Sequence, residues 1–519
     1  MPRPTEEAGA LKASVDPEDI PGIVEGLRQT FNTDKTRSKA WRLAQLDALD
    51  KLLTEGCDDL CKAMYADIHK SDLEGWFQEI ALVRGEIYEA KQHLDHWMAD
   101  EHVGSGLLNT PSQSMVQKDP LGVVLILGAW NYNVLLSLHP LVGAIAAGNC
   151  AIIKPGSYSE TSSHTICRLV QKYMDPECIR AVEGNRHITS SLLEQKLDKI
   201  FFTGSPFVGQ VVAEAAAKQL CPVVLELGGK SPCVIDRKAD LAIAAKRCAW
   251  GALMNSGQTC VRPDYFMVHE AIADDFIKTL KRTIVQFYGR DPQKTKWFGR
   301  IVNDAAFRRL NGCVEDAKQY LVHGGENDAN DRFIAPSVFD FGTDMHAFES
   351  SALMQDEIFG PLIPIFRYRD FDGQVLPFIR ARPKPLALYC FTSDNELAER
   401  ALRLTSSGAA LINDVVVHLS NSELPFGGVG ASGMGSYHGK RSFDAFSHHK
   451  AVMRRGTLLD APQRYPPYSS LDEAVLRLGL HPKVSFHFTQ MTNFITDKKN
   501  FLITLMTAYI AHQHLRSRM

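Results

Sequence analysis

Cys260 is the residue in this 519-residue chain whose surroundings best suit a nucleophile. It lies in the stretch MNSGQTCVRPDY, residues 254–265, directly after a Gly-Gln-Thr turn. A cysteine attacks an electrophilic carbon when nearby N–H groups or positive charge favour its thiolate, and Arg262 is one source of such charge. The chain has ten other cysteines, so the local pattern leaves ordinary packing as an alternative for Cys260.

Two further side chains have chemistry that a cysteine nucleophile requires. Glu226 ends a strand-like run in LELGGKSP, residues 225–232, and a carboxylate in an apolar setting can serve as a general base. Asn131 follows another apolar run, and its side-chain NH₂ group can donate to an oxyanion. A capped surface charge and a turn asparagine are the plain alternatives for these two positions.

The stretch FFTGSPFVG, residues 201–209, could bind a phosphate because it turns from a strand into a helix. The N–H groups and dipole at a helix N-terminus suit a pyrophosphate, with Gly204, Ser205 and Gly209 at the turn. The spacing differs from the usual G-x-G-x-x-G pattern, so this signal is weak by itself. A tight strand–helix turn without a ligand is an equal alternative.

Alternating strands and helices must position these residues. Helical spacing of apolar residues from about Ile20 to Ala99 predicts helices. Short apolar runs then alternate with helical stretches, which favours a parallel sheet covered by helices. A second α/β block extends from about Lys230 to Val415. The runs predicted as strands are 122–130, 149–155, 198–205 and 221–229, followed in the second block by PDYFMVHE, PLIPIFRY, PLALYCFTS and AALINDVVVH.

Composition limits what else the protein can be. The 57 basic and 60 acidic residues give a net charge of −3, which argues against a nucleic-acid partner. Eleven scattered cysteines suit free thiols in a reducing compartment. Cys57 and Cys61 lie one helical turn apart, but they lack a second ligand pair, so we expect helix packing and no metal. We also expect no secretory signal and no membrane-spanning segment.

The order and spacing of the motifs resemble the aldehyde dehydrogenase superfamily, most closely its class 3 branch, which includes the fatty aldehyde dehydrogenases. The resemblance covers about residues 23–455. The motifs that carry it are WNY (130–132), IIKP (152–155), FTGS (202–205), LELGGKSP (225–232), NSGQTC (255–260), EIFGP (357–361), KPLALY (384–389) and the block 424–448.

The resemblance implies a role for each matching position. Cys260 would attack an aldehyde carbon, Glu226 would activate water, and Asn131 with the backbone N–H of Cys260 would hold the oxyanion. Each preorganised donor is worth about 3 kcal/mol in comparable sites. The implied cofactor contacts are Lys154 and the position of Ser157 at the adenosine ribose, Gly204 and Ser205 with nearby Gly209 at the pyrophosphate, Glu357 at the nicotinamide ribose and Phe359 near the nicotinamide.

Four departures from the family pattern affect these expectations. Ser157 stands where the family has a ribose-binding glutamate, and Glu160 is predicted to lie within the next helix, so we expect use of both NAD and NADP. Ala129 and Asn133 replace two common prolines, which predicts a less rigid loop around Asn131. Arg262 replaces a small residue, so it would lower the pKa of the Cys260 thiol or narrow the substrate tunnel. Ala431 replaces an asparagine with no evident consequence.

The resemblance also implies the architecture: a Rossmann-like cofactor domain, a catalytic α/β domain and a small bridging β element that pairs subunits. The predicted boundaries are 17–104 with 122–229 for the cofactor domain, 230–415 for the catalytic domain, 105–121 with 416–455 for the bridge, and 456–519 for a C-terminal tail whose prolines at 460–470 predict an extended connector.

The implied function is NAD(P)-dependent oxidation of an apolar, long-chain aliphatic aldehyde to its acid by a homodimer. A long polyene aldehyde (an apocarotenal) is an alternative substrate. Acyl transfer to coenzyme A is disfavoured by Glu226, and a scaffold without activity is disfavoured by the joint presence of Cys260, Glu226 and Asn131.

We expect an intracellular protein, cytoplasmic or peripherally attached to an internal membrane. One helical face of the tail could contact that membrane or the partner subunit, through Ile495, Leu502, Leu505, Met506 and Tyr509.

Overall fold

The chain forms two units, and the computed structural model describes residues 15–106, 109, 111–457, 460 and 462–480. Unit 1 comprises Met1–Leu94 and Pro120–Phe446, and unit 2 comprises Asp95–Asp119 and Ser447–Met519. The predicted bridging segment 416–455 is therefore divided, because its residues 416–446 belong to unit 1. The reason is physical: Gly433 pairs with Glu226 in the first sheet of unit 1, and the helix Lys440–Ala445 packs on the same half of that unit.

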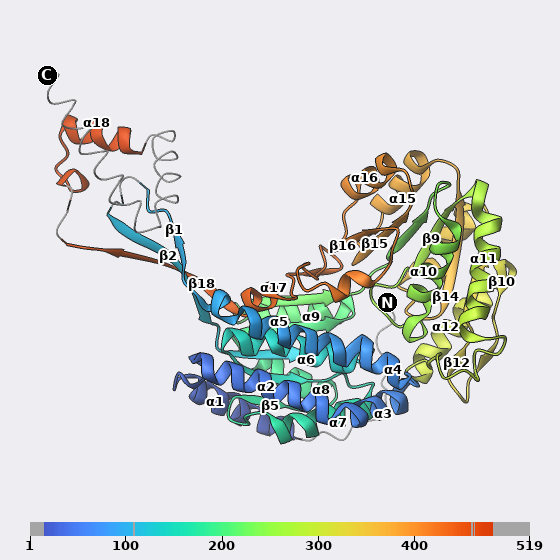
Figure 1. The fold of residues 1–519 in the computed structure, drawn as a ribbon, viewed down its shortest axis with the longest axis horizontal. Coiled ribbons are helices and arrows are strands. Elements are labelled where there is room, and N and C mark those ends of the chain that lie inside the picture. The colour runs from blue at the N-terminus through green and yellow to red at the C-terminus, as the bar shows by residue number, and fades with distance from the viewer. Residues whose placement is uncertain (1–14, 107–108, 110, 458–459, 461, 481–519) are drawn as a thin grey trace. The chain divides into compact units, whose positions relative to one another are not determined.

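A six-stranded sheet forms one half of unit 1 (Figure 1). Its order is β17-β7-β6-β3-β4-β5, parallel throughout except for β17 against β7. From β3 the chain moves outward to β4 and β5 and then returns to β6 and β7 on the other side. Ligands of such doubly wound sheets bind at the carboxyl ends near this reversal. The strands are β3 (Val123–Leu127), β4 (Cys150–Lys154), β5 (Ile179–Ala181), β6 (Lys199–Gly204), β7 (Val223–Leu227) and β17 (Gly433–Met434).

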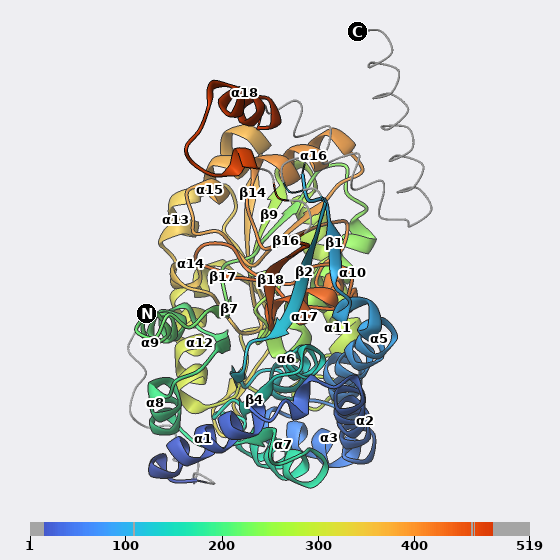
Figure 2. The same cartoon turned by 90° about the vertical axis from the view of Figure 1, so that its left-hand side faces the viewer.

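The sequence predictions for this sheet are confirmed, because β3, β4, β6 and β7 fall within the four predicted apolar runs. Every residue of β3 and β4 is buried, as expected for strands with helices on both faces. The helices α2, α3 and α7 pack against one another at the lower part of Figure 2. The helices of this half are α1 (Ile20–Phe31), α2 (Lys39–Glu55), α3 (Cys57–Ile68), α4 (Asp72–Gly75), α5 (Ala81–Met98), α6 (Asn133–Ala147), α7 (Glu160–Tyr173), α8 (Arg186–Glu194), α9 (Pro206–Ala217) and α17 (Lys440–Ala445).

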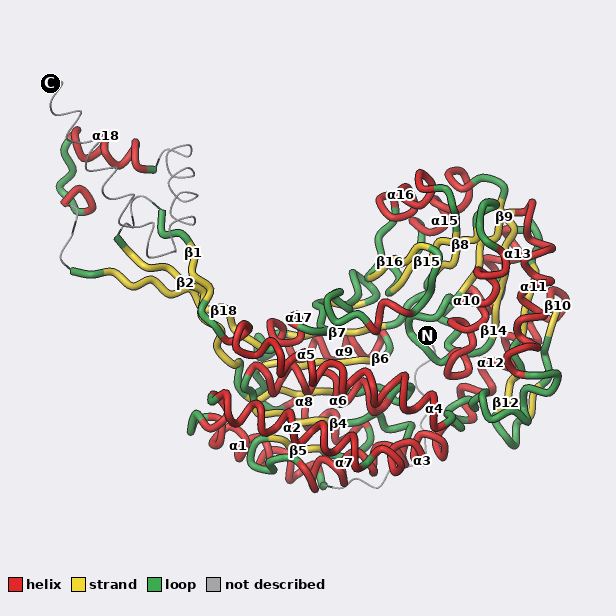
Figure 3. Tube along the Cα trace, in the orientation of Figure 1, coloured by secondary structure: helices red, strands yellow, loops and turns green. Residues whose placement is uncertain are grey.

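A seven-stranded sheet forms the other half of unit 1, with strands and covering helices distinguished in Figure 3. Its order is β10-β13-β14-β9-β8-β15-β16, and only β10 runs antiparallel to its neighbour. The strands are β8 (Pro232–Ile235), β9 (Tyr265–His269), β10 (Leu321–His323), β13 (Ser337–Asp340), β14 (Leu362–Tyr368), β15 (Ala387–Phe391) and β16 (Ala409–Ile412). The helices are α10 (Leu241–Leu253), α11 (Glu270–Tyr288), α12 (Asp304–Asp316), α13 (Met345–Ser350), α14 (Ala352–Gln355), α15 (Leu376–Arg380) and α16 (Asn395–Leu404).

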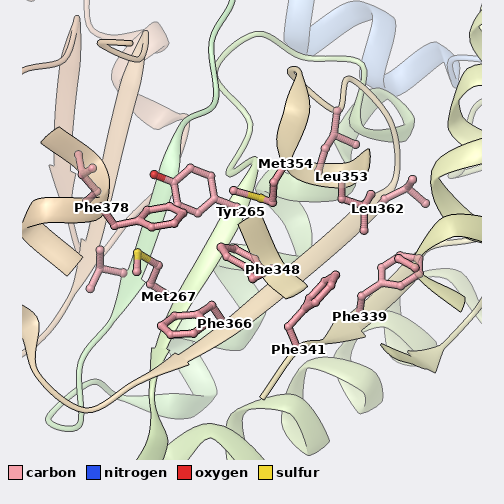
Figure 4. Close-up of a cluster of buried hydrophobic side chains, with 14 of the residues drawn as sticks. Tyr265, Met267, Phe339, Phe341, Phe348, Leu353, Met354, Leu362, Phe366 and Phe378 are labelled. Carbon is pink, nitrogen blue, oxygen red and sulfur yellow. The ribbon is translucent and has the colours of Figure 1, made fainter. Parts of the chain in front are cut away.

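Aromatic side chains fill the core of this second half (Figure 4). Phe348 lies at its centre, with ring centroids 5.5 Å from Phe366 and 5.7 Å from Phe378. Tyr265, the first residue of β9, contacts both Phe348 and Phe378 edge to face. Aromatic pairs in this geometry stabilise beyond their buried area. The cluster therefore fixes the start of β9, directly after the segment that carries Cys260.

Unit 2 contains a three-stranded sheet in the order β1-β2-β18, with β1 at Glu101–Val103, β2 at Ser112–Pro120 and β18 at Ser447–Arg455. Lys450 of β18 forms an ion pair with Asp119 of β2 at 2.6 Å. The predicted connector over 460–470 is partly wrong, because Pro462–Arg464 form a 3₁₀ turn before helix α18 (Ser470–Gly479). The apolar tail positions from Ile495 to Tyr509 lie outside the described residues. No helix in the described part of the chain has the length and apolar character to cross a bilayer.

Candidate active site

Loops at the carboxyl ends of parallel strands bring most of the predicted site residues to one edge of the six-stranded sheet. Asn131 follows β3, Lys154 ends β4, Gly204 ends β6, and Glu226 lies one residue before the end of β7. Parallel neighbours end at the same edge, so these residues from distant parts of the sequence converge there. This edge is where doubly wound sheets place their ligands.

Cys260 follows a backbone turn of unusual conformation. Asn255, Ser256 and Gly257 all have positive φ, at 53°, 54° and 73°. A β-carbon on Gly257 would lie 2.2 Å from the carbonyl oxygen of Gly360, so only glycine fits there. The Gln258 side chain holds the turn by donating to the carbonyl oxygens of Asn255 (3.1 Å) and Arg300 (2.9 Å). Strained residues of this kind persist where the surroundings fix them, as at active sites.

The Cys260 thiol is partly exposed and has two carboxyl groups among its neighbours. Burial raises the pKa of this thiol to about 12, and Glu357 and Glu226 add to the rise. The backbone N–H groups of Cys260 and Val261 act in the opposite direction. The free protein therefore holds the sulfur as a neutral thiol near pH 7, and a base must remove its proton before it can attack.

The expectation that Arg262 narrows the substrate tunnel is wrong. Its Nη2 atom donates to the carbonyl oxygen of Leu362 at 2.7 Å, and Nη1 lies 3.5 Å from Asp264. The pKa of the Cys260 thiol is raised, and burial with the carboxyl groups of Glu357 and Glu226 has the largest effects on it. The Arg262 side chain is 1% exposed, so it offers no surface to a substrate tunnel.

The loop that carries Asn131 is joined to the Cys260 turn by direct hydrogen bonds. The Asn131 side chain donates from Nδ2 to the carbonyl oxygen of Gln258 at 3.0 Å. In return, Nδ2 of Asn255 donates to the carbonyl oxygen of Asn131 at 2.9 Å. The Tyr132 hydroxyl is 2.7 Å from the Thr259 hydroxyl. One N–H of the Asn131 amide remains to donate to an oxyanion beside the thiol.

A buried ion pair, Lys70 with Glu79, also contacts the loop that carries Asn131. Lys70 and Glu79 contact each other with 1% exposure each, and Lys70 also donates to the carbonyl oxygen of Asn131 at 3.3 Å. Glu79 accepts from the backbone N–H groups of Val134 (2.9 Å) and Leu135 (3.2 Å) at the start of α6. A carboxylate there satisfies free N–H groups and opposes the helix dipole. Sequence reasoning missed this pair, and we find no sequence signal that would have identified it.

Asn133 supplies contacts that a proline could not make. Its Nδ2 atom donates to Ser163 Oγ at 3.0 Å and to the carbonyl oxygen of Ser159 at 3.3 Å, and its Oδ1 atom accepts from the N–H of Gly156 at 2.8 Å. The basis for predicting a looser loop therefore no longer holds. Gly156 is also required, because a β-carbon there would lie 2.4 Å from the backbone nitrogen of Trp130.

Glu226 is buried, so the interpretation as a capped surface charge is wrong. The residue is 2% exposed and neither carboxyl oxygen has a hydrogen-bond partner. Burial raises its pKa well above the ordinary value. A carboxyl group with both oxygens free and a raised pKa is suited to exchanging protons with a water molecule or a thiol nearby.

Lys154 and Ser157 lie together at the end of β4. Burial lowers the pKa of Lys154 to about 8, and its ammonium donates to Ser157 Oγ at 2.8 Å and to the carbonyl oxygen of Pro155 at 3.1 Å. Ser157 donates in turn to the carbonyl oxygen of Gly184 at 2.9 Å. Glu160 is exposed and is the first residue of α7, which confirms that it lies within that helix.

The turn after β6 presents a helix N-terminus. Ser205 is exposed and caps α9, accepting from the N–H of Val208 at 3.4 Å, while Gly204 ends the strand. Gly209 is buried on the first turns of α9, a helix that packs on β6 and β7. The arrangement leaves backbone N–H groups and the positive end of a helix dipole at the sheet edge, which suits a pyrophosphate.

Glu357 and Phe359 come from the second half of unit 1 and reach the same edge. The carboxyl group of Glu357 lies against Gly228, just after β7. Burial raises the pKa of Glu357 to about 8, and its Oε1 atom is buried without a hydrogen-bond partner. Phe359 has φ 50° and contacts Trp130 edge to face at 5.5 Å.

These observations fit a dinucleotide. The unpartnered oxygen of Glu357 can accept from a ribose hydroxyl, the α9 N-terminus can receive a pyrophosphate, and Lys154 offers a cation at the end of β4.

A metal is not indicated, because no group of three His, Cys, Asp or Glu side chains within the described residues is arranged to hold one. Cys61 instead donates to the carbonyl oxygen of Asp72 at 3.6 Å. Nothing in the structure explains Ala431, which is exposed.

A doubly wound sheet with a dinucleotide site, beside a cysteine on a strained turn, defines a dehydrogenase of the cysteine-dependent class. The model described as the aldehyde dehydrogenase family matches residues 2–452, and the chain belongs to that family. It is an NAD(P)-dependent aldehyde dehydrogenase.

Curated relatives cover most of the chain. Aldehyde dehydrogenase family 3 comG of Dictyostelium discoideum is 44% identical, over 91% of this chain and 98% of its own length. The dimeric NADP-preferring aldehyde dehydrogenase of the dog, Canis lupus familiaris, is 42% identical, over 86% and 98%. The 4,4′-diaponeurosporen-aldehyde dehydrogenase of Staphylococcus aureus is 41% identical, over 84% and 94%. These matches confirm the resemblance to the class 3 branch.

A solved structure confirms the fold. The substrate-bound AldH of Staphylococcus aureus superposes with a TM-score of 0.85 at 40% identity, over 88% of this chain and 98% of that one. The predicted aldehyde dehydrogenase architecture is therefore correct.

Proposed function

We propose that this enzyme oxidises apolar aldehydes, long-chain aliphatic ones above all, to carboxylic acids through a thioester on Cys260. One observation carries the proposal. The Cys260 sulfur lies beside its own N–H and the N–H of Val261, with the unpartnered carboxyl group of Glu226 near it, and Asn131 is hydrogen-bonded to the turn that carries Cys260. That set contains a nucleophile, oxyanion donors and a base, which aldehyde oxidation requires.

The residues of the chain divide the chemistry between them. The Cys260 thiol gives up its proton to solvent water, and the sulfur then adds to the carbonyl carbon and forms a C–S bond. The free N–H of Asn131 and the N–H of Cys260 donate to the resulting oxyanion, at about 3 kcal/mol each. Lys154, Glu357 and the N-terminus of α9 would hold NAD(P), which would supply the hydride acceptor. Loss of hydride from the carbon bound to sulfur leaves a thioester on Cys260. Glu226 then removes a proton from water, whose oxygen attacks the thioester carbon. The C–S bond breaks, the acid leaves, and the Cys260 sulfur takes back a proton from Glu226.

Chain length is expected to govern catalytic efficiency if the substrate is apolar. Each methylene buried against protein is worth about 0.8 kcal/mol, which corresponds to up to about fourfold in kcat/KM. We expect kcat/KM to rise from propanal to decanal and longer aldehydes, measured as NADH formation with each member of the series. A flat series, or one that falls beyond four carbons, would exclude an apolar substrate site.

A long polyene aldehyde is a second candidate substrate. The similarity to the Staphylococcus aureus enzyme named for 4,4′-diaponeurosporen-aldehyde supports it. Including an apocarotenal in the same series separates the two candidates, because a polyene-specific site would turn over this compound faster than any saturated aldehyde of equal length.

Cofactor choice is expected to depend on Ser157. A glutamate at this position would repel the 2′-phosphate of NADP, and two charges a few ångströms apart interact by about 1–4 kcal/mol. The chain has Ser157 there, with the Lys154 ammonium 2.8 Å from it. We expect kcat/KM with NADP to lie within about tenfold of that with NAD.

Substitution tests this expectation. Ser157→Glu should restore a preference for NAD of about tenfold or more, whereas Ser157→Gln, of similar size but uncharged, should not. A wild-type preference for NAD of several hundredfold would show that another group enforces the choice.

We further propose that the enzyme is an intracellular homodimer whose tail, residues 456–519, makes peripheral membrane contact. The relative named as dimeric supports the dimer. Light scattering of the purified chain tests it, since a monomer mass would refute it. Sedimentation of the full chain with anionic lipid vesicles tests the membrane contact, which would be refuted if a truncation before Asp460 sediments equally.

A further inference from the structure

Arg262 is a fully buried cation that the catalytic scheme does not use. The side chain is 1% exposed, and neither Nε nor Nη1 has a hydrogen-bond partner. Its Nη2 atom donates to the carbonyl oxygen of Leu362 at 2.7 Å. Burying a guanidinium is costly unless anions compensate it. The carboxyl groups that act on its charge are those of Asp264 and Glu357.

Asp264 connects Arg262 to the segment that carries Glu357. Its Oδ1 atom accepts from the N–H of Ile358 at 3.0 Å and lies 3.5 Å from Arg262 Nη1. Its Oδ2 atom lies 2.6 Å from the Lys230 ammonium. Lys230 also donates to the carbonyl oxygens of Leu353 (2.7 Å) and Asp356 (2.9 Å). The three charged side chains therefore hold the backbone on both sides of Glu357.

The same charges decide the ionisation of Glu357. Burial and the neighbouring Asp264 raise the pKa of this carboxyl, while the N–H of Gly229, Lys230 and Arg262 lower it, with a result of about 8. The Cys260 thiol is the other titratable group that interacts with Glu357. An ionised carboxylate accepts hydrogen bonds with both oxygens, whereas a protonated one has less acceptor capacity.

We propose that Arg262 is a positioning residue for the dinucleotide: its buried guanidinium, together with Lys230, favours the charged form of the Glu357 carboxyl group, and Asp264, paired with both cations, holds the Glu357 segment in place, so that Glu357 can accept hydrogen bonds from the nicotinamide ribose. Arg262 acts through Glu357 and touches neither substrate nor cofactor. This inference rests on the proposed function, in which Glu357 binds that ribose. It assigns a role to the residue that departs from the family pattern two positions after Cys260.

The pH dependence of NAD binding tests the proposal. Fluorescence titration of the full chain with NAD from pH 6 to 10 should show affinity rising with pH through a midpoint near 8, because Glu357 gains its charge there. Lys154 loses its proton in the same range and would change affinity in the opposite direction. Glu357→Gln should therefore abolish the rising limb, and a rising limb that survives in this variant overturns the proposal.

Two substitutions should move the midpoint in opposite directions. Arg262→Met removes a cation, so we expect the midpoint to rise by about one pH unit and affinity at pH 7.5 to fall about tenfold, with kcat at saturating NAD changed far less. Asp264→Asn removes an anion, so the midpoint should fall. Either variant is informative if the other fails to fold, and a midpoint that stays at the wild-type value or moves the other way overturns the proposal.

Arg309→Met is the matched control. Arg309 donates from Nη2 to the carbonyl oxygen of Ile358 at 2.6 Å, so it holds the same segment, whereas the cations with the largest effect on the pKa of Glu357 are Lys230 and Arg262. This variant should weaken binding and move the midpoint much less than Arg262→Met does. If Arg309→Met shifts the midpoint as much as Arg262→Met does, the shift reflects general disturbance of the Glu357 segment, and the proposed role of the Arg262 charge is overturned. Wild-type protein that neither binds NAD nor oxidises decanal would refute the proposed function itself, whereas active wild type with unshifted variants would refute only the role of Arg262.

Discussion

Cys260→Ala should lose turnover by at least about 10⁴-fold while it still binds the dinucleotide. The covalent intermediate forms on the sulfur, and alanine removes this atom without altering the hydrogen bonds of the Gln258 side chain. NADH formation from decanal measures the loss. Binding at 100 times Kd stabilises a folded protein by about 2.7 kcal/mol, so NAD should still raise the melting temperature of the variant.

A second cysteine variant controls for general damage. Cys57→Ala changes a partly exposed thiol on α3, far in the sequence from the site, and should retain wild-type turnover. Substantial NADH formation by Cys260→Ala would contradict the whole catalytic assignment. Loss of both turnover and NAD-dependent stabilisation would instead show that the substitution disturbs the fold.

Glu226→Gln should block deacylation more than acylation. The amide is close in size to the buried carboxyl, so the site keeps its shape, but it cannot take a proton from water. Rapid mixing of enzyme, NAD and decanal should give a burst of about one NADH per active site, followed by turnover slowed by about 10²–10⁴-fold. Absence of a burst would place the essential role of Glu226 earlier, in removing the thiol proton.

The pKa values of the site predict the pH dependence of the burst. Burial holds protons on both Cys260 and Glu226 in the free protein, and each must lose one before it reacts as nucleophile or base. The rate of the NADH burst should therefore increase as pH rises. NAD affinity should increase over the same range, because Glu357 also loses its proton there. Wild-type and variant enzymes should be compared at several pH values for this reason.

The fold could be predicted from short apolar runs because β3, β4, β6 and β7 are buried on both faces and read as continuous apolar segments. The short strand β17 gives no such signal, since its Gly433 and Met434 are positioned by pairing with β7 and not by their own propensity. The sequence therefore contained no indication that residues 416–446 join unit 1. Tertiary pairing decides such short strands.

Site residues that lie inside a recognised motif could be predicted from the sequence. Contacts between residues far apart in the sequence could not. Residues such as Gln258 and Tyr132 lie inside motifs that sequence analysis recognised, although their hydrogen bonds could not be derived. The pair Lys70 and Glu79 lies over fifty residues before Asn131 in a helical region, where charged residues usually face solvent. The direction of the Arg262 side chain also depends on Asp264 and Leu362, and no local pattern encodes it.

Mass spectrometry of the trapped intermediate tests the central claim most directly. Glu226→Gln mixed with decanal and NAD, quenched in acid within the burst and digested, should yield the peptide that contains Cys260 with the added mass of one decanoyl group. Omitting NAD should prevent this thioester, because hydride must leave before it can form. A decanoyl group on another cysteine, or an unmodified Cys260 peptide at the height of the burst, would contradict the account.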